Sequence, residues 1–557
     1  MDNYQIADTF SLLSKLMDIH GENSFKSKSY SSVAFTIEKL PTQLSEMPKE
    51  NIASIKGIGA SSAQKIIELL ETGELKNLHE LIFLTPPGVV EMLNIKGIGP
   101  KKIHTIWKEM EIESIGELLY ACKENRLKLY KGFGEKTQQN VSDIIEFYLK
   151  NKGSHLYASI ENIVPEIEQI LVNTFVGKRV LLTGNFKRQM PTIDELEFVI
   201  EADEEFIEKT LLGIEGFSLK ERKDDSVVYN NSSGLNVRIY GVNTNEVLRT
   251  YINTSSSREF SEALLKEINI GELEDENSCF AAAGLAFIPS PVREDVGIIE
   301  LLRTGIMPDV IQAADIKGII HCHSNWSDGS NTLEEMAKAA MERGLEYLVI
   351  SDHSRSAFYA QGLSEERIRE QHLLIDELNK KLAPFKIFKS IESDILNDGN
   401  LDYSNEVLAS FDVVIASVHS NLKMSKEKAM MRLMTAIENP YTTILGHMTG
   451  RLLLSREGYP VDHETIIDAC AANNVAIELN ASPSRLDIDW KHIAYAMKKN
   501  VLISIDPDAH SIDALDYNKY GVLVAQKALL PKERNLSSFT LAEIESYIAE
   551  RKKLKGI

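Results

Sequence analysis

The last part of the chain, from residue 315 onward, carries the pattern that most constrains its fold. Short apolar runs alternate there with stretches of helical periodicity, and most of the runs end in a side chain that binds metals. Residues 318–320 lead directly into His321 and His323, and residues 501–505 lead into Asp508 and His510. Alternating strands and helices form parallel βα units, whose active sites lie at the carboxyl ends of the strands. We therefore predict an α/β barrel with a cluster of metal ligands at one end.

Nine side chains of ligand type follow successive predicted strands in this region. They are His321, His323, Asp328, His353, Glu392, His419, His447, Asp508 and His510. Side chains two residues apart share one face of a strand, so we expect the histidines of the first pair to converge. Imidazole and carboxylate ligands together favour Mn²⁺, Zn²⁺ or Fe²⁺ over Mg²⁺ or Ca²⁺. The histidines at positions 372, 463 and 492 fall outside this pattern, and we interpret them as structural.

Residues 1–150 carry a different repeat. Apolar residues recur at helical spacing, and a Gly-x-Gly turn joins two predicted helices three times. The glycines are Gly57, Gly59, Gly97, Gly99, Gly132 and Gly134. Such a turn lets the backbone approach a phosphate, and the next helix offers unpaired N–H groups. With Lys65, Lys101 and Lys102 nearby, three helix-hairpin-helix copies favour DNA-backbone binding over a simple tight turn between packed helices.

The net charge of −21 argues against uniform binding of nucleic acid, so its distribution matters. The net charge is about −2 over residues 1–150, about −12 over residues 151–314, and about −7 over residues 315–557. The hairpin region is thus almost neutral. We expect the middle region to be a poor place to concentrate DNA.

The order of motifs resembles that of the family X DNA polymerases of bacteria and archaea. Phe25-Lys26-Ser27-Lys28-Ser29-Tyr30 precedes the first hairpin, as in the small N-terminal domain of that family. Lys65 matches the Schiff-base lysine with which eukaryotic members remove a deoxyribose phosphate. That chemistry needs a lowered amine pKa, and we favour a phosphate-contacting lysine instead.

The middle region resembles the nucleotidyltransferase palm of the same family, with altered metal ligands. Gly184-Asn185-Phe186-Lys187-Arg188 stands where the family has Gly-Ser-x-Arg-Arg, which cradles the triphosphate. Glu195 and Glu197 replace the Asp-x-Asp pair, and Asn236 replaces the third carboxylate. Mg²⁺ tolerates little change in ligand geometry, and the loss of a charge weakens the site further. We expect no Mg²⁺ in this palm and predict that nucleotide addition is lost.

The C-terminal region resembles the PHP (polymerase and histidinol phosphatase) domain, and all nine ligands match that family's positions. The resemblance implies a distorted seven-stranded βα barrel with three divalent metal ions, bridged by Glu392. Asp352 and Glu392 are our candidate catalytic residues. Arg451 and Arg485 lie in motifs where they would neutralise a substrate phosphate, although solvated surface arginines are the alternative.

We expect a multidomain fold, divided into five segments. They are a helical domain with the first hairpin over 1–83, a fingers-like hairpin region over 84–150, an α+β palm over 151–250, a thumb-like region with a linker over 251–314, and the PHP barrel over 315–557. Residues 286–295 resemble the thumb signature that precedes the PHP domain in family X enzymes.

The combination predicts a metal-dependent DNA phosphodiesterase of DNA repair. A 3′→5′ exonuclease fits best, with cleavage at abasic sites or removal of 3′ phosphates as variants of the same chemistry. The alternatives are an active gap-filling polymerase with exonuclease, a DNA-end scaffold without catalysis, and a histidinol-type small-molecule phosphatase. The partner is DNA with gaps, nicks or recessed 3′ ends. Four scattered cysteines, no apolar run of membrane length and no secretion signal predict a cytoplasmic, nucleoid-associated monomer.

Overall fold

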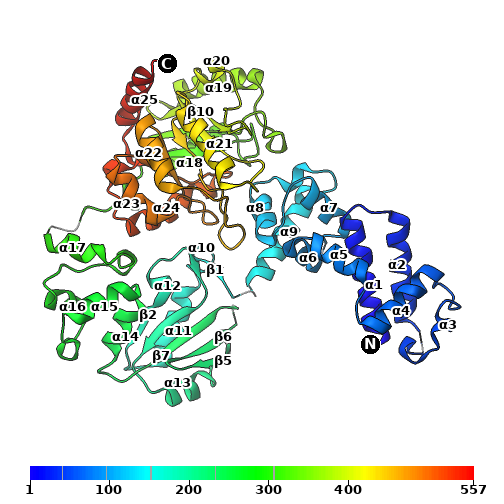
Figure 1. Cartoon of the computed structure of the whole chain (residues 1–557). Helices are drawn as coiled ribbons and strands as arrows, with labels where there is room; N and C mark the ends of the chain where they lie inside the picture. Colours follow the sequence, from blue (N-terminus) through cyan, green and yellow to red (C-terminus); the bar gives the residue numbers. More distant parts are fainter. Residues whose placement is uncertain (41, 96, 151–152, 233, 305–307) are drawn as a thin grey trace. The chain divides into compact units, whose positions relative to one another are not determined.

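The computed structural model describes residues 1–557 except 41, 96, 151–152, 233 and 305–307 (Figure 1). The chain divides into two compact units, which are described separately. Unit 1 comprises Met1–Lys123 and Leu127–Glu146, and unit 2 comprises Glu124–Arg126 and Phe147–Ile557. Among the described residues, every helix is too short or too polar to span a membrane.

Unit 1 is helical, as predicted. Its helices are α1 (Asn3–Ile19), α2 (Ser24–Glu38), α3 (Lys49–Ile52), α4 (Ala60–Thr72), α5 (Lys76–Leu84), α6 (Pro87–Glu91), α7 (Pro100–Lys108), α8 (Ile115–Lys123) and α9 (Glu135–Lys150). α1 begins with a capping box at Asp2 and packs against α2, where Phe10 and Tyr30 meet edge to face. The predicted segment 1–83 and most of the segment 84–150 lie in this unit, and the boundary between them stays a prediction.

The first part of unit 2 is a five-stranded sheet. Its strands are β2 (Val180–Thr183), β4 (Leu196–Ile200), β5 (Phe217–Lys223), β6 (Ser226–Asn231) and β7 (Asn236–Gly241), in the order β2-β4-β7-β6-β5. β4 and β7 are parallel, and the other neighbouring pairs are antiparallel. A small ladder joins β1 (His155–Leu156) to β3 (Thr192–Ile193). This α+β arrangement corresponds to the region that we predicted as a palm.

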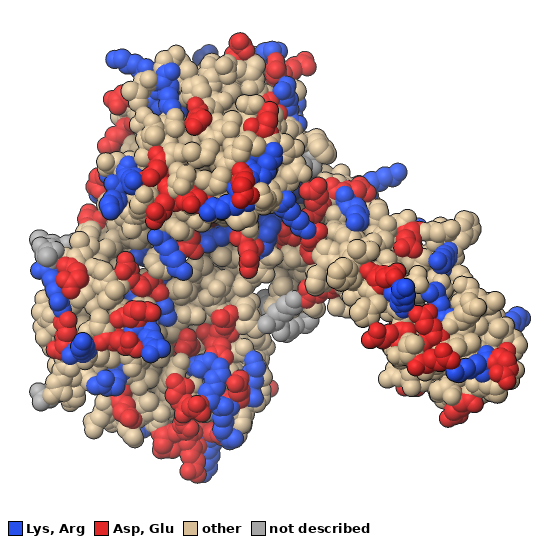
Figure 2. Space-filling model, in the orientation of Figure 1, with Lys and Arg blue, Asp and Glu red and all other residues tan. Residues whose placement is uncertain are grey.

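Helices cover both faces of that sheet. Apolar side chains of α11 (Val164–Thr174) and α13 (Glu204–Leu211) share one core with the sheet, while α14 (Val247–Thr254) packs on its other face through Val247 and Tyr251. The remaining helices of this part are α10 (Tyr157–Ile160), α12 (Gly184–Lys187), α15 (Arg258–Lys266), α16 (Glu276–Ala282) and α17 (Gly297–Thr304). In Figure 2, acidic side chains gather, with basic ones among them, in the area where Figure 1 draws α13. The N-cap and first turn of that helix carry Asp203, Glu204 and Glu205.

The second part of unit 2 is a parallel seven-stranded barrel, which confirms the predicted fold class. Its strands are β8 (Gly318–Cys322), β9 (Tyr347–Ile350), β10 (Lys386–Asp394), β11 (Val413–Ser417), β12 (Ile444–Leu445), β13 (Ala476–Asn480) and β14 (Ile503–Asp506). They follow one another in sequence order around the sheet, and a parallel bridge between Cys322 and Ala509 links the two ends. The barrel is therefore nearly closed.

Helices surround this barrel. They are α18 (Leu333–Glu342), α19 (Glu365–Leu382), α20 (Asn405–Leu408), α21 (Lys426–Glu438), α22 (His463–Asn473), α23 (Trp490–Lys498), α24 (Asn518–Lys527) and α25 (Leu541–Lys555). α25 buries Ile544 and Ile548 against side chains of the strands, including Tyr347 and Phe388. These packed helices fix the strand ends on which the ligand-type residues lie.

Two details of the strands differ from expectation. Glu392 lies inside β10 rather than beyond its end, because that strand extends to Asp394. His321 lies inside β8 with a positive φ of 58°, and the pairing register of β8 shifts around it. The first histidine pair thus reaches the site through this irregular backbone, not through the simple alternation of side chains that we predicted.

Candidate metal centre and the palm pocket

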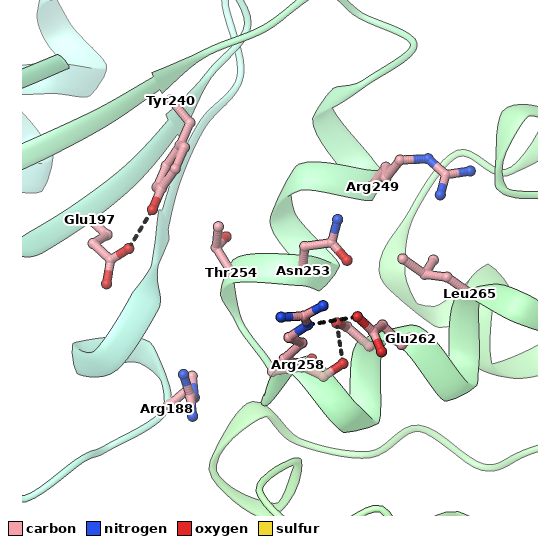
Figure 3. Close-up of a pocket in the computed structure, with 11 residues that line it drawn as sticks. Arg188, Glu197, Tyr240, Arg249, Asn253, Thr254, Arg258, Glu262 and Leu265 are labelled. Carbon is pink, nitrogen blue, oxygen red and sulfur yellow. Dashed lines mark hydrogen bonds and ion pairs between the residues drawn. The ribbon is translucent and has the colours of Figure 1, made fainter. Parts of the chain in front are cut away.

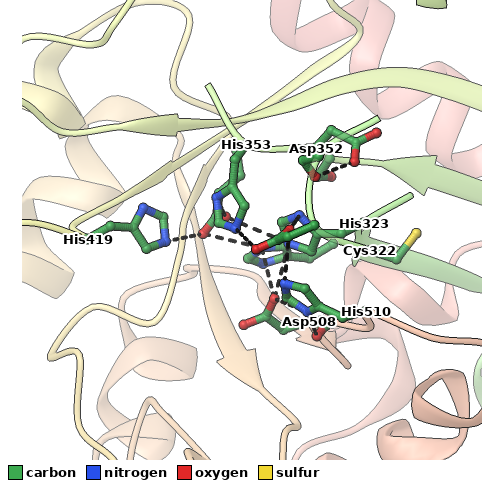
Figure 4. A network of polar contacts seen from close by, with 12 residues as sticks. Cys322, His323, Asp352, His353, His419, Asp508 and His510 are labelled. Atoms are coloured by element: carbon green, nitrogen blue, oxygen red, sulfur yellow. Dashed lines mark hydrogen bonds and ion pairs between the residues drawn. The ribbon is translucent and has the colours of Figure 1, made fainter. Parts of the chain in front are cut away.

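All nine predicted ligands lie together at the carboxyl ends of the barrel strands (Figure 4). Eight of them are buried, and His419 is partly exposed. Glu392 is their centre. Its Oε1 atom is 3.0 Å from Nε2 of His447, 3.1 Å from Nε2 of His419 and 3.3 Å from Nε2 of His321. Its Oε2 atom is 2.9 Å from Nδ1 of His353. This carboxylate, which four imidazoles surround, could contribute a ligand to more than one of the ions that the cluster would hold.

Two aspartates complete the cluster. Oδ1 of Asp508 is 3.5 Å from Nε2 of His321 and 3.2 Å from Nε2 of His323. Oδ2 of Asp328 is 3.5 Å from Nε2 of His353, and its Oδ1 is 3.5 Å from Nε2 of His510. Candidate metal-binding groups with donor atoms within 4.8 Å of one another include His323, Asp328, His353 and His510 together, His321, His323 and Asp508 together, and His353, Glu392 and His419 together.

The side chains fit bound divalent ions. Both ring nitrogens of His323, both carboxylate oxygens of Asp328 and Oε2 of Glu392 are buried without a hydrogen-bond partner. An orphaned buried polar atom costs about 1–3 kcal/mol, so several in one cluster need a compensating ligand. Metal coordination by imidazole and carboxylate would satisfy them.

The histidines and carboxylates of the cluster stabilise each other's charged forms. Burial opposes protonation of His419 and His510, but neighbouring carboxylates outweigh it and raise the pKa of each to about 9. Burial likewise opposes ionisation of Asp328 and Glu392, yet the surrounding histidines lower the pKa of both carboxyl groups well below the usual range. The cluster therefore holds its carboxylates ionised, as metal ligation requires.

Two carboxylates behind the ligands were missing from our sequence predictions. Oε2 of Glu478 is 2.8 Å from Nδ1 of His321, and Asp394 accepts a short hydrogen bond from Nδ1 of His419. Such bonds fix the ring orientation of a metal-ligating histidine. Each of these acids stands within an otherwise apolar strand, and this position could have identified it. A carboxylate buried in a strand needs a hydrogen-bonding or charged partner.

The candidate catalytic residues beyond Glu392 lie in different surroundings. Asp352 accepts hydrogen bonds from the Ser324 backbone N–H at 2.8 Å, the Ser327 hydroxyl at 2.5 Å and the Gln371 side-chain amide at 2.7 Å. These bonds connect it to the loop that carries Asp328. The catalytic role of Asp352 stays a prediction.

The two candidate phosphate-binding arginines also differ. The Arg451 guanidinium binds Asp489 at 2.7 Å and the backbone carbonyl groups of Arg485 and Leu486. Arg485 is buried, with Nε 3.8 Å from Oδ2 of the ligand Asp508. Arg485 thus lies beside the candidate metal centre. Arg451 instead binds the backbone of the segment that contains Arg485.

The Gly-x-Gly turns have the backbone that we predicted for helix-hairpin-helix copies. Gly57, Gly97 and Gly132 adopt positive φ values of 99°, 92° and 94°. Gly59 and Gly99 are the N-cap residues of α4 and α7, so the free N–H groups of each helix follow the turn directly. Gly134 precedes α9 in the same way.

Among the three predicted DNA-contacting lysines of unit 1, Lys101 is exposed and Lys65 and Lys102 are partly exposed. Nζ of Lys65 donates a hydrogen bond to the side-chain oxygen of Asn77 at 2.9 Å, and Nζ of Lys102 lies 5.4 Å from the ring centre of Phe133. Lys101 is exposed at the start of α7, and Lys96 of the second turn lies outside the described residues. These positions allow the three described lysines to reach a phosphate backbone.

The palm residues form a second site, in which protein cations neutralise a carboxylate. Nε of Arg238 is 2.5 Å from Oε2 of Glu195, and Nζ of Lys223 is 3.3 Å from its Oε1. Lys220 donates a hydrogen bond to Oδ1 of Asn236 at 2.8 Å. Three of the protein's own cations thus contact two of the residues that we predicted as altered palm ligands, Glu195 and Asn236.

Glu197 faces elsewhere, into a pocket of about 620 Å³ (Figure 3). It accepts hydrogen bonds from the Tyr240 hydroxyl at 2.8 Å and from the Asn185 backbone N–H at 3.2 Å, and burial raises its pKa. A Cβ atom on Gly184 would lie 2.0 Å from Oε1 of Glu197, so only glycine fits there. Arg188 also lines the pocket, but its guanidinium binds both carboxylate oxygens of Glu294 at 2.7 and 2.6 Å.

Comparisons with known proteins agree with this division of the chain. Residues 1–75 match a helix-hairpin-helix domain, residues 89–144 match a SAM-like helix-hairpin-helix tandem, and residues 320–482 match the PHP domain. The DNA polymerase/3′-5′ exonuclease PolX of Bacillus subtilis (strain 168) is 31% identical over 554 residues, which cover 96% of each chain. A probable phosphatase of Caldanaerobacter subterraneus subsp. tengcongensis is 25% identical over 251 residues, 42% of this chain and 92% of that protein.

Fold and ligand cluster together define a helix-hairpin-helix protein with a C-terminal PHP domain. The chain belongs to the PolX-type family X DNA polymerases. Membership in this family, together with the PHP domain, supports an enzyme with phosphoesterase activity.

Proposed function

We propose that this protein is a metal-dependent 3′→5′ DNA exonuclease whose chemistry resides in the barrel. The observation that carries the proposal is the buried cluster around Glu392, with Arg485 beside it. The relative from Bacillus subtilis is named as a DNA polymerase and 3′-5′ exonuclease, which supports DNA as the substrate. Probable phosphatases among the relatives support the same phosphate-ester chemistry.

In the proposed reaction, three divalent ions (Mn²⁺, Zn²⁺ or Fe²⁺) would be held by the nine ligands. When bound, such ions supply a hydroxide nucleophile at neutral pH and stabilise the charge that develops on the phosphoryl group. Arg485 would bind a phosphate oxygen, while Glu478 and Asp394 hold the rings of His321 and His419. Water adds to phosphorus, the P–O3′ bond breaks, and a proton passes to the 3′ oxygen as the terminal nucleoside monophosphate leaves.

The test uses purified full-length protein, Mn²⁺ and primer–template DNA labelled within the primer. We expect the wild type to shorten the primer from its 3′ end and the variant with His321→Ala and His323→Ala to leave it intact. Equal digestion by both proteins would overturn the assignment. Substrates with an internal abasic site, or with a 3′ phosphate, separate exonuclease from the two related cleavage reactions.

The hairpins would grip the backbone of DNA ends through N–H groups at helix starts. Gly97→Ala tests this, because φ is 92° and no atom lies within 4 Å of the added Cβ, so only backbone strain of about 1–2 kcal/mol is introduced. Gly73→Ala is the matched control, with a φ of 79°, the same open space and a position outside the repeat. We expect several-fold weaker binding of a fluorescent recessed DNA for Gly97→Ala than for Gly73→Ala. Equal binding would contradict the role of this turn.

A second candidate is a gap-filling polymerase, which the name of the Bacillus subtilis relative favours. The contacts of Glu195 with Arg238 and Lys223 support our preference for a palm without nucleotide addition. Primer extension on gapped DNA with dNTPs and Mg²⁺ or Mn²⁺ decides between them. Template-directed extension that Glu195→Ala abolishes would establish the polymerase, whereas we expect no extension by the wild type.

A further inference from the structure

Residues Glu124–Arg126 form a short segment that belongs to unit 2, although 203 residues separate Asn125 from the predicted ligand Asp328. We call it the edge segment. The side-chain amide of Asn125 donates a hydrogen bond to the Ser330 hydroxyl at 2.7 Å and a longer one to the Asp328 carbonyl oxygen at 3.4 Å. The Ser330 N–H in turn donates to the His510 carbonyl oxygen at 2.7 Å. The edge segment is therefore attached to a loop that carries one predicted ligand and contacts another.

The backbone on both sides of this attachment is closely defined. Asn125 adopts a positive φ of 56°, a left-handed conformation in which asparagine is found more often than most residues. In the loop that it contacts, a Cβ atom on Gly329 would lie 2.5 Å from the His323 carbonyl oxygen. The turn at Asn125 and the closely packed loop together keep the preceding residue at the ligand cluster.

That preceding residue is Glu124, which is buried with 9% exposure and was absent from our sequence predictions. One of its carboxylate oxygens, an oxygen of Asp508 and a ring nitrogen of His510 all lie within 4.8 Å of one another, as in a candidate metal-binding group. Two buried carboxylates at such a distance repel each other, and a cation that both of them bind removes the repulsion. The position of Glu124 thus suits a ligand.

The ion pair between Glu124 and Arg126 does not account for this position. Nη1 of Arg126 is 3.5 Å from Oε2 of Glu124, which is longer than a charge-assisted hydrogen bond of about 2.7–2.9 Å. An ionised carboxylate accepts at about four lone-pair sites, so this contact leaves Glu124 able to bind a metal ion as well.

The charge balance of the cluster also favours a further carboxylate. The nine predicted ligands include three carboxylates, those of Asp328, Glu392 and Asp508. Three divalent ions would bring six positive charges to these three negative ones, and an excess of buried charge is costly. Glu124 adds one negative charge at the edge of the cluster that Asp508 and His510 form.

We propose that Glu124 is a tenth ligand of the metal cluster and binds, together with Asp508 and His510, the ion at this edge. The inference rests on the proposed function, because it requires that the barrel hold divalent ions. It extends the metal centre beyond the barrel strands to the edge segment.

The experiment measures metal binding by the full-length protein after its metal has been removed with a chelator. Mn²⁺ affinity is determined by titration against a competing fluorescent chelator, and the visible absorption of bound Co²⁺ reports the ligands of the ion. The variants are Glu124→Gln, which preserves side-chain size, and Arg126→Gln, which removes the cation of the ion pair. Glu135→Gln is the matched control, because it makes the same substitution at an exposed position of α9.

We expect Glu124→Gln to weaken the binding of one ion by at least about 10-fold, the smallest loss found for groups that only orient ligands. The Co²⁺ spectrum should change, because a carboxylate oxygen leaves the ion. The variant should melt like the wild type in EDTA and at a lower temperature than the wild type with Mn²⁺, since the metal stabilises the folded state less. Arg126→Gln and Glu135→Gln should keep wild-type metal affinity.

Three results would overturn the inference. The first is wild-type affinity and an unchanged Co²⁺ spectrum in Glu124→Gln. The second is an equal loss of stability with and without metal, which would indicate a structural role. The third is an equal loss of affinity in Arg126→Gln, which would assign the effect to the ion pair.

Failure of the proposed function has a different signature. A wild type that binds the ions but digests no DNA would contradict the exonuclease, while the affinity and the Co²⁺ spectrum would still decide the role of Glu124. A wild type that binds no ions would overturn both.

Discussion

The barrel and the palm both bring acidic side chains together, but they neutralise them in opposite ways. In the barrel, Glu392 is surrounded by imidazoles, and buried donor atoms around it lack hydrogen-bond partners. In the palm, Glu195 is matched by Arg238 and Lys223, and Glu197 by the Tyr240 hydroxyl. The barrel cluster has nitrogen and oxygen atoms without hydrogen-bond partners, which bound metal ions would satisfy. In the palm cluster, arginine and lysine already neutralise the carboxylate, so little negative charge is left to bind a metal ion. The same chain thus holds one site built for ions and one whose charges are satisfied within the protein.

The largest effect is expected for Glu392→Gln. Loss of this central charge should remove bound metal and lower DNA hydrolysis by more than about 100-fold, a larger effect than that of residues that only orient the ligands. Metal content by mass spectrometry and the rate of primer digestion measure the two effects. Glu366→Gln, at an exposed position of α19, is the control. Full metal content in Glu392→Gln would show that the barrel binds metal without this carboxylate. The charge of Glu392 would then not distinguish the barrel from the palm.

Glu478→Gln and Asp394→Asn should each reduce metal affinity or activity by about 10- to 100-fold, because each carboxylate orients one histidine ligand. Metal titration with a competing chelator measures the affinity. Since Gln and Asn preserve side-chain size, a loss reports the missing charge rather than a cavity. Unchanged metal affinity in both variants would show that Glu478 and Asp394 do not contribute to metal binding, which would then depend on the candidate ligands alone.

Lys527 of α24 tests how firmly the palm is attached to the barrel. Its Nζ donates to the carbonyl groups of Arg188 at 2.7 Å and Pro291 at 3.2 Å, and lies 3.6 Å from Oε1 of Glu294. Lys527→Met leaves these buried acceptors unsatisfied, and we expect a loss of about 2 kcal/mol in the free energy of unfolding. Chemical denaturation measures it, and a change below about 0.5 kcal/mol would contradict the role of this contact.

The same lysine gives a pH dependence of known sign. Burial, which outweighs the attraction of Glu294, lowers the pKa of Lys527 from 10.5 to about 8. Between these two values the unfolded chain binds the additional proton, so unfolding becomes less favourable as pH rises. We expect the stability of the wild type to increase relative to Lys527→Met across that window. A flat or falling difference would contradict the lowered pKa.

The smallest effect is expected for Glu195→Ala. It leaves the barrel untouched, so primer digestion should stay at the wild-type rate, while loss of the ion pair with Arg238 should cost about 1 kcal/mol of stability. Arg238→Ala, and the double variant, complete a cycle that isolates the pair. A large fall in digestion would show that the palm contributes directly to the reaction.

The sequence was sufficient to predict which ligand-type side chains the barrel brings together, because residue type and spacing point to the same positions there. His419 and His447 could be assigned once each was seen to follow an apolar run, since parallel strand ends converge. The supporting acids Glu478 and Asp394 could not be assigned in this way, because an acid inside a strand becomes a partner only when the neighbouring strand brings a histidine within reach. Asp352 and Arg451 also have partners that the sequence did not predict. Asp352 accepts a hydrogen bond from the Ser324 backbone N–H, and Arg451 donates one to the Arg485 carbonyl, while their roles in the reaction stay predictions.

The sequence by itself determined the kinds of module and predicted which ligand-type side chains come together, because periodicity and residue type are local properties of the chain. It also predicts that the palm carboxylates are altered. Tertiary structure decided what became of each charge: Glu195 meets Arg238 across paired strands, and Glu392 meets histidines from other strands. These partners are far apart in sequence, and the energy of a buried charge depends on which groups the fold places within a few ångströms of it.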